Sequence, residues 1–256
     1  MKNIFVFDLD GTIILENKRL NEFILKKLIE LQRNGHEVVF ATSRSLRGIR
    51  AVLQPELLSN PLILCNGSFS IINNEIAVSK YVDKEECTNL VCYLEKNDIQ
   101  FYLELGNELY IPSYGTHPFF EILLKEAYNE VVHSKFDNID SKVYKIAVVD
   151  SLSTDIINDL LSIVNKSRIY QHSDGSVDIV ASDCSKWKML QELRLSSSAT
   201  RLIAFGNDSN DIEMIKNADI GVAVCPLNET LDKAADIKIN DYSPDSIIKQ
   251  IDQILC

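Results

Sequence analysis

The chain of 256 residues is long for one domain and short for two large ones, so a core domain with an inserted second unit is expected. Its composition, 46% apolar and 25% charged, is ordinary for a globular protein with a sizeable core. The 26 basic and 37 acidic residues give a net charge of −11, which disfavours nucleic acids and anionic membranes as partners. An anionic substrate therefore needs a locally positive pocket, supplied by a metal ion and a few cationic side chains.

Neither the cysteines nor the hydropathy pattern indicates secretion or a membrane. The six cysteines show no C-x-x-C pair and no zinc-type spacing, which is typical of reduced thiols in a cytoplasmic protein. No apolar run approaches the roughly 20 residues that a membrane span needs. The N-terminus enters an apolar strand without a basic and then apolar leader, so no signal peptide is expected.

The first expected strand ends in two aspartates. The apolar residues at 4–7 predict a strand buried on both faces, as in a parallel sheet. Because an unpaired buried carboxylate is costly, Asp8 and Asp10 indicate that the strand opens into a crevice, where open α/β sheets bind ligands. Residues two apart in an extended chain point the same way, so both carboxylates should face one site, and their oxygens suit Mg²⁺. The alternative is an ordinary strand end followed by an Asp-Gly turn.

The next segments complete a strand–helix–strand unit. Apolar spacing predicts a helix at about 21–34, a strand at 36–41 and a second helix at 46–53. Thr42 and Ser43 stand between that strand and that helix, where hydroxyls and free helix N–H groups can bind an oxyanion. The alternative for Ser43 is a helix N-cap only. Two further extended segments are expected, a strand at 62–65 and a hairpin at 69–78.

From about residue 80 to residue 185 the pattern changes. Helices alternate with short aromatic-rich strands that do not end in carboxylates, which indicates a separate α+β unit. Its histidines lack the spacing of metal ligands and are expected at the surface; they are His117, His133 and His172. Its aromatic residues are expected mostly in the core of the unit, with Tyr110 and Tyr114 as candidates for substrate contact. The expected helices are at 85–97, 118–128 and 155–164, and the expected strands are at 101–105, 108–111, 143–149 and 177–181.

The core pattern returns after residue 185. Lys186 lies in the first turn of an expected helix, against the usual preference for acids there, which makes sense if it meets an anion. The alternative is a solvated surface lysine. A polar cluster at 206–211 follows an expected strand at 201–205 and precedes another helix, which is a typical position for a functional loop. Further strands at 219–224 and 237–239 and a closing helix at 246–255 are expected.

Several of these motifs together carry a family resemblance. In chain order they are Asp8, Asp10, Thr42, Lys186 and the loop 206–211. With them the chain resembles the Cof-type branch of the haloacid dehalogenase superfamily of phosphatases over essentially its whole length. The resemblance implies an α/β fold with a Rossmann-like parallel-sheet core, formed by residues 1–79 and 186–256. It also implies a mobile α+β cap, formed by residues 80–185, over the carboxyl ends of the core strands.

The resemblance implies roles for the matching residues. Asp8 attacks phosphorus and forms an aspartyl-phosphate. Asp10 protonates the leaving oxygen and later activates the hydrolytic water. Phosphoryl transfer of this kind needs positioning and charge neutralisation more than further covalent chemistry. The candidate phosphate-binding residues are Thr42, Ser43, Lys186 and Asn210.

The implied metal site departs from the family pattern at one position. The implied Mg²⁺ ligands are Asp8, Asp10 through its backbone carbonyl, Asn207 and Asp211. The family loop usually begins with Gly-Asp, whereas here Asn207 follows the glycine. An amide oxygen binds without charge, so the affinity for Mg²⁺ should be lower unless Asp208 or Asp211 compensates.

The predicted function is that of a Mg²⁺-dependent phosphatase that hydrolyses small phosphorylated metabolites, such as sugar phosphates. One alternative is a phosphotransferase or phosphomutase that uses the same aspartyl-phosphate. A second alternative is a non-catalytic protein that binds a phosphorylated metabolite, for which Asn207 is the only hint. The partner is expected to be a small metabolite rather than a nucleic acid or a membrane, and the expected location is cytoplasmic.

Overall fold

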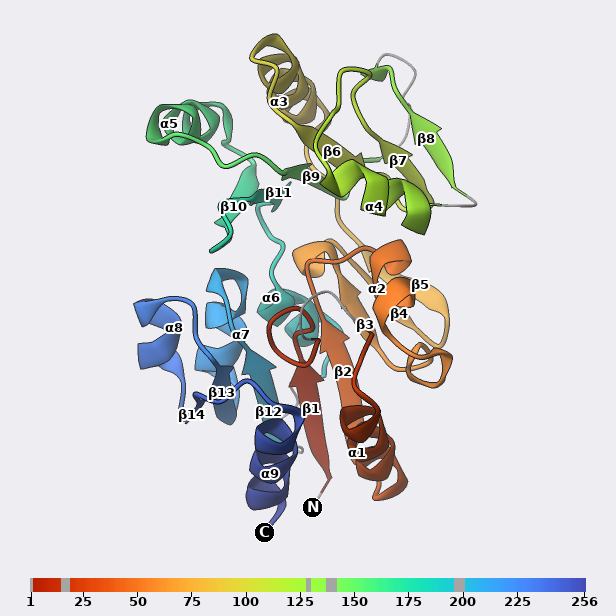
Figure 1. Cartoon of the computed structure of the whole chain (residues 1–256), viewed down its shortest axis with the longest axis vertical. Coiled ribbons are helices and arrows are strands. Elements are labelled where there is room, and N and C mark those ends of the chain that lie inside the picture. Colours follow the sequence, from red (N-terminus) through yellow and green to blue (C-terminus); the bar gives the residue numbers. More distant parts are fainter. Residues whose placement is uncertain (1, 15–18, 128–129, 137–141, 196–200) are drawn as a thin grey trace.

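The computed structural model describes residues 2–14, 19–127, 130–136, 142–195 and 201–256. The chain forms two sheets, drawn one above the other in Figure 1, with helices packed around each. The lower sheet has eight strands and the upper sheet has six. Over the ranges given above, none of the helices is both long enough and apolar enough to cross a membrane.

The eight-stranded sheet contains β1 (Asn3–Phe7), β2 (Glu37–Ala41), β3 (Leu62–Leu64), β4 (Phe69–Ile72), β5 (Glu75–Ser79), β12 (Arg201–Gly206), β13 (Ile220–Val224) and β14 (Ile237–Ile239). Their order is β14-β13-β12-β1-β2-β3-β4-β5, parallel as far as β3, with an antiparallel β4–β5 hairpin at the edge. The chain leaves β1 toward β2 and later returns to β12 on the other side of β1. Ligands bind outside the carboxyl ends of strands at such a reversal of strand order.

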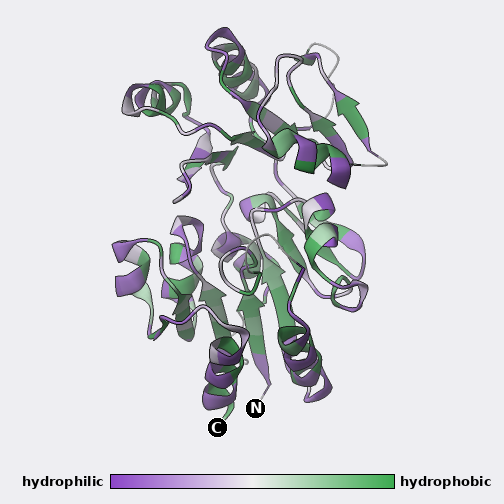
Figure 2. Cartoon of the chain, viewed as in Figure 1, coloured by the Kyte–Doolittle hydropathy of each residue, from purple (hydrophilic) through white to green (hydrophobic). Residues whose placement is uncertain are grey.

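Helices cover both faces of this sheet; they are α1 (Glu22–Arg33), α2 (Leu46–Val52), α6 (Lys186–Glu192), α7 (Ile212–Asn217), α8 (Glu229–Ala234) and α9 (Pro244–Leu255). Alternate residues of β1 point to opposite faces. Phe5 and Phe7 pack with apolar residues of α1, α2 and α9. Ile4 and Val6 pack with those of α6, α7 and α8. The central core strands in Figure 2 are accordingly mostly hydrophobic, with polar residues at their first positions, because both faces are covered.

The six-stranded sheet contains β6 (Phe101–Glu104), β7 (Glu108–Tyr110), β8 (Val131–His133), β9 (Lys145–Val148), β10 (Ser167–Gln171) and β11 (Val177–Ala181). Their order is β10-β11-β9-β6-β7-β8. Helices α3 (Lys84–Lys96) and α5 (Thr154–Ile163) pack on one face of this sheet. Helix α4 (Phe119–Glu126) packs on the other face, the remainder of which is turned toward the core sheet.

The predicted fold class is confirmed: a parallel α/β core carries a mixed insertion. All six strands of the smaller sheet lie between residues 80 and 185, and we keep 80–185 as the proposed cap and 1–79 with 186–256 as the proposed core. The elements β8, β10 and α8 were not predicted, because short segments carry little periodicity and are held by their neighbours. The helix expected at 118–128 ends at Glu126, and residue 128 lies outside the described residues.

Candidate active site

Most of the predicted site gathers at the carboxyl ends of β1 and β12. Asp8 follows β1 directly, and its backbone N–H donates to the carbonyl of Phe205 in β12 at 2.9 Å. The loop after β12 continues into a 3₁₀ turn (Ser209–Asp211) that leads into α7. A Cβ at Gly206 would lie 2.5 Å from Cβ and Cγ of Asp211, so only glycine leaves room for that side chain. The two segments therefore meet where the strand order reverses.

Lys186 lies between two carboxylates. Its Nζ is 2.6 Å from Oδ1 of Asp8 and 2.6 Å from Oδ1 of Asp211, and all three residues are buried. Burial and the Asp211 carboxylate raise the pKa of Asp8 to about 7, although Lys186 opposes that rise. Burial disfavours the charge of Lys186, but the two carboxylates outweigh it and raise the pKa of the ammonium. Lys186 is thus a buried cation that meets anions, not the solvated lysine of the alternative.

Asp211 organises the loop as well as Lys186. Its Oδ2 accepts hydrogen bonds from the backbone N–H groups of Asn207 at 2.9 Å and Asp208 at 3.2 Å. Both carboxylate oxygens of Asp211 therefore have partners within the protein. Its role as a metal ligand stays a prediction.

Further oxygen atoms lie on the other side of Asp8. Thr12 Oγ1 donates to Oδ2 of Asp8 at 2.9 Å, and Oδ1 of Asn207 is 3.5 Å from the same hydroxyl. Gly11, with φ of +75°, admits Asn207, because a Cβ there would lie 1.9 Å from its Nδ2. Carboxylate and amide oxygens are hard ligands that fit Mg²⁺. Across the described segments no three His, Cys, Asp or Glu side chains are grouped to hold a metal, so an ion here also needs neutral oxygens.

Asp10 pairs with an arginine to which the sequence assigned no role. Arg44 donates from Nε and Nη2 to the two carboxylate oxygens of Asp10, each at 2.7 Å. Such a bidentate pair fixes the plane of the carboxylate. The backbone N–H of Arg44 donates to Oγ1 of the fully buried Thr42 at 3.1 Å. Arg44 Nη1 also lies 3.8 Å from Glu126 of α4, which links the pair to the cap.

A cleft of about 610 Å³ separates the two sheets at this place. The predicted site residues that line it are Asp8, Asp10, Ser43, Asn207 and Asn210. Three more predicted residues lie behind its wall and bond to the residues around them: Thr42, Lys186 and Asp211. All eight candidates thus lie in or behind one wall of one cleft. Which of them contact phosphate stays a prediction.

The opposite wall of the cleft comes from alternate residues of the cap strands. The strand register places Tyr102, Ala147 and Asp178 in one row across β6, β9 and β11. Glu104 and Lys145 face each other in the next row, and all five residues line the cleft. Lys145 Nζ is 3.0 Å from Oδ1 of Asp178. In each of these strands the cleft-facing residues alternate with buried apolar ones. This alternation is the signal in the sequence that indicates such a wall.

His172 and Asp178 connect the cap with the core loop. Nε2 of His172 is 3.2 Å from Oδ2 of Asp178, and its Nδ1 is 3.4 Å from Oδ2 of Asp208. Burial opposes the charge, but these two carboxylates raise the pKa of His172 to about 10. Burial is likewise outweighed at Asp178, whose pKa Lys145 and His172 lower to about 2. The expectation of an ordinary surface position for His172 was wrong: its side chain is only 13% exposed, because the β10–β11 hairpin folds onto the core loop.

Comparison with known proteins decides the family. Residues 5–251 match the family of haloacid dehalogenase-like hydrolases. The chain belongs to this family. One relative, 5-amino-6-(5-phospho-D-ribitylamino)uracil phosphatase YcsE of Bacillus subtilis, is 24% identical over 97% of this chain and 94% of its own. Another, pyridoxal phosphate phosphatase YbhA of Escherichia coli, is 22% identical, with 97% of each chain covered.

The fold of this hydrolase also has close counterparts among solved structures. A sugar phosphatase of HAD subclass IIB superposes with a TM-score of 0.83 at 19% identity, over 99% of both chains. This likeness confirms the Rossmann-like core with a cap. The family match and the phosphatase names of the relatives confirm the predicted superfamily and enzyme class.

Two tyrosines in the cap of this hydrolase do not reach the cleft. Tyr110 is fully buried, and its hydroxyl bonds to Oε1 of Glu95 at 2.5 Å. Tyr114 packs against the apolar core that Tyr110 shares with α3 and α5. Neither residue lines the cleft, so the predicted substrate contact by Tyr110 and Tyr114 is wrong. Tyr102 and Phe119 line it instead, because Tyr102 lies on the face of β6 opposite to the cap core.

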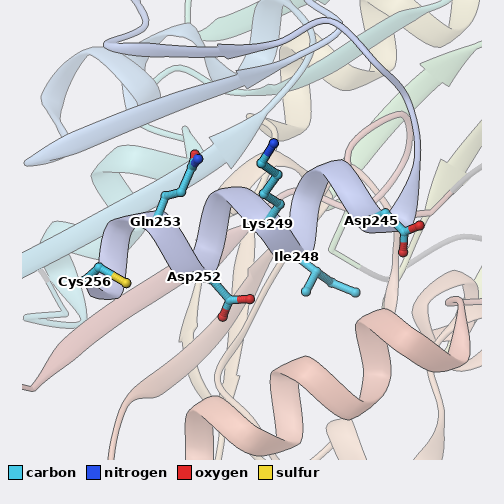
Figure 3. Close-up of a pocket in the computed structure, with 6 residues that line it drawn as sticks. All are labelled: Asp245, Ile248, Lys249, Asp252, Gln253 and Cys256. Atoms are coloured by element: carbon cyan, nitrogen blue, oxygen red, sulfur yellow. The ribbon is translucent and has the colours of Figure 1, made fainter.

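A second hollow lies on the outside of α9 (Figure 3). The residues that line it are Asp245, Ile248, Lys249, Asp252, Gln253 and Cys256. They belong to α9 and to Cys256, the residue that follows it, at the end of the core away from the cap (Figure 1). None of the predicted site residues lies there, so the candidate active site of the hydrolase is the cleft between the sheets.

Proposed function

We propose that this hydrolase is a Mg²⁺-dependent phosphatase that acts on small phosphorylated metabolites through an aspartyl-phosphate. The observation that carries the proposal is the buried cluster in which Lys186 and Asp211 lie behind the wall of the cleft and Asp8 lines it. A carboxylate that is held by an ammonium and still lines a cleft suits a nucleophile. Its strongly raised pKa supports a functional site, because such shifts gather at functional sites.

The reaction runs in two halves. In the first, the Asp8 carboxylate attacks phosphorus, the bond from phosphorus to the leaving oxygen breaks, and Asp10 gives that oxygen a proton. In the second, Asp10 takes a proton from a water molecule that attacks the aspartyl-phosphate, which releases phosphate and restores Asp8. Lys186 offsets the repulsion between the Asp8 carboxylate and the phosphate anion. Arg44 pairs with Asp10 in its ionised form, which is the form that takes the proton from water in the second half.

The residues that hold Mg²⁺ in this proposal are Asp8, Asn207 and the backbone carbonyl of Asp10, with Asp211 behind them. The oxygen atoms grouped around Thr12 support this assignment. The bound ion supplies positive charge that neutralises the phosphoryl oxygens. Orientation, proton transfer and exclusion of water remain the work of the protein's own residues.

The substrate class follows from the cleft. A volume of about 610 Å³ suits a small metabolite, and acidic, basic and aromatic side chains line it together. The relatives named above are phosphatases of a ribitylamino-uracil phosphate and of pyridoxal phosphate. We therefore extend the proposal to sugar phosphates and phosphorylated vitamins or their precursors. The six unpaired cysteines support a cytoplasmic location.

The test is a phosphate-release screen over sugar phosphates, phosphorylated vitamins and nucleotides, with Asp8→Asn as the blank. We expect Mg²⁺-dependent release by the wild type, none by Asp8→Asn, and about 10²–10⁴-fold slower release by Asp10→Asn. Product analysis in the presence of acceptor hydroxyls separates hydrolysis from phosphotransfer. Wild-type rates in Asp8→Asn would contradict covalent catalysis. Turnover that appears only in Asn207→Asp would identify a binding protein instead.

A further inference from the structure

The turn at Cys65–Gly67, directly after β3, contacts the segments that carry Thr42 and Lys186. The backbone N–H of Asn66 donates to the carbonyl of Thr42 at 3.0 Å. A Cβ at Gly67 would lie 2.4 Å from the carbonyl oxygen of Ser185, so the turn touches the residue before Lys186. Asn66 itself is fully buried, with φ of 57° and ψ of 31°, a left-handed conformation that asparagine tolerates. The backbone of this turn is therefore fixed by the core.

The side chain of Asn66 joins the cap to the phosphate-binding loop. Its Nδ2 donates to Oδ2 of Asp178 in β11 at 2.8 Å. Its Oδ1 accepts a hydrogen bond from Nδ2 of Asn210 at 2.9 Å. One buried amide thus bonds to a cap carboxylate with one end and to a predicted phosphate ligand with the other.

The direction of these hydrogen bonds matters chemically. An ionised carboxylate only accepts, so Asp178 turns the NH₂ end of the Asn66 amide toward the cap. The carbonyl end of Asn66 then faces Asn210 and holds the NH₂ end of that second amide. The ionised oxygens of a phosphoryl group also only accept, so Asn210 can bind them only with N–H groups. Asn66 thus takes one N–H of Asn210 and fixes the plane of that amide, and the second N–H of the same NH₂ group is the donor that can reach a phosphoryl oxygen.

We propose that Asn66 is a positioning residue that couples docking of the cap to phosphate binding. When Asp178 is in place, Asn66 orients the Asn210 amide for the phosphoryl group, and when the cap moves away that orientation is lost. By linkage, phosphate in the site also favours the docked cap. The inference rests on the proposed function in one respect, that Asn210 contacts the phosphoryl group.

The test is a double-mutant cycle on the affinity for inorganic phosphate, measured by calorimetry with the full chain and Mg²⁺. Asn66→Asp keeps the shape but places a carboxylate opposite Asp178, and we expect binding roughly tenfold weaker or more. Asp178→Asn alone measures what the loss of this carboxylate does by itself, because it also leaves Lys145 and His172 without their anionic partner. With both changes the amide stands at position 178 and the carboxylate at position 66, so a donor again faces an acceptor. We therefore expect the double variant to bind phosphate more tightly than Asn66→Asp alone.

Asn60→Asp is the matched control. Asn60 is also a buried asparagine with both ends of its amide bonded, to the carbonyl of Leu57 at 2.8 Å and to Gln32 at 2.7 Å. It does not line the cleft. Asn60→Asp should leave the phosphate affinity unchanged and add independently to Asp178→Asn. Thermal unfolding of every variant shows whether a loss of binding comes from a loss of folding.

Each result of the double-mutant cycle either supports or overturns the coupling through Asn66. Losses that simply add in the Asn66 and Asp178 cycle overturn the coupling, and so does an unchanged phosphate affinity in Asn66→Asp. A wild type that binds no phosphate overturns it as well. If the cycle is non-additive while the wild type releases no phosphate from any ester, the inference stands and the proposed phosphatase function fails.

Discussion

At the scale of single residues, the protonation of the site depends on the ratio of carboxylates to cations, because two buried carboxylates face one ammonium. Asp8 and Asp211 share one ammonium, that of Lys186, and all three side chains are buried. Asp8 carries the consequence, since burial and Asp211 together raise its pKa to about 7. The ionised form of Asp8 is thus destabilised in the absence of a further cation. A bound metal ion would supply that cation and favour the ionised form, which is the nucleophile.

Asp8→Asn should therefore stabilise the metal-free protein while it abolishes turnover. The folded-state pKa of Asp8, about 7, lies above its ordinary value of 3.8, so ionised Asp8 lowers the stability most fully above pH 7. We expect the melting temperature of Asp8→Asn in chelator to exceed that of the wild type by more at pH 8 than at pH 5. Thermal scans at both pH values check this, and a gap that narrows at pH 8 would count against it.

Asn207→Asp should lower the Mg²⁺ concentration that gives half-maximal activity, by several-fold. The change adds one negative charge where an amide oxygen stands beside Asp8 and Thr12, and ligand charge is a main determinant of affinity for hard cations. A Mg²⁺ titration of phosphate release from both proteins measures the effect. An unchanged midpoint would remove Asn207 from the metal site.

Asp211→Ala should destabilise the fold as well as the site. It leaves Lys186 buried with one anionic partner and removes the acceptor of two backbone N–H groups. Breaking a buried pair in this way costs about 3 kcal/mol or more. Urea unfolding of the variant and the wild type gives the difference. A variant of normal stability that lost only its response to Mg²⁺ would instead make Asp211 a metal ligand.

At the scale of elements, the two faces of the cap sheet differ in function: one forms the core of the cap and the other forms a wall of the cleft. In β6, β9 and β11 one face packs on α3 and α5, and the other lines the cleft beside α4. Period-two alternation assigns each side chain to one face. Substrate preference should therefore depend on cleft-facing residues and not on residues of the cap core.

Phe119→Ala tests this division. Phe119 lines the cleft, with its ring centroid 6.0 Å from that of Tyr102, so its loss should change the ratio of kcat/KM between two metabolites. Hydrolysis of a small aryl phosphate should change little, because its leaving group is small. Tyr110→Phe is the control: it removes a bond to Glu95 within the cap and should leave the ratio unchanged. Equal shifts in both variants would show that the cap responds as one unit.

At the scale of the whole molecule, charged side chains join the cap to the core at several places, among them Arg44 with Glu126 and Arg168 with Glu213. Two further links hold more than one charged partner each. On one side, Arg47 of α2 bonds to Glu104 at 2.6 Å and to Glu130 at 2.5 Å. On the other side, His172 bonds to Asp208 of the core loop, while it also bonds to Asp178 within the cap. A change of charge at either link should therefore alter how stably the cap is held against the core.

The link through His172 should weaken at high pH. Its pKa is about 10 in the folded protein against an ordinary 6.5, so its stabilisation is fully present below pH 6.5 and is lost as the pH rises through about 10. We expect the difference in unfolding free energy between wild type and His172→Gln to shrink from pH 6 to pH 10. Denaturant unfolding at several pH values measures it, and a constant difference would mean that the ring is not charged.

The sequence by itself predicted the parallel α/β core, the strand ends at which the candidate site lies, and the family. It could do so because the pattern is local: an apolar run that ends in Asp8 and Asp10 marks a strand end, and a polar loop after another apolar run marks the second. Thr42 and Lys186 were found in the same way, from their positions next to expected elements. In an open α/β sheet such strand ends meet at one edge, so sequence position implies spatial position.

Only the tertiary structure decided which groups pair with which. Arg44 with Asp10, Asp211 with Lys186, and Asn66 between Asp178 and Asn210 join residues that lie 25 to 144 positions apart. No local pattern specifies such contacts, because they depend on the register of the strands and on how the cap lies over the core. The same holds for Tyr102 and Tyr110, which look alike in the sequence. The face of the sheet on which each stands places the first at the cleft and the second in the core of the cap.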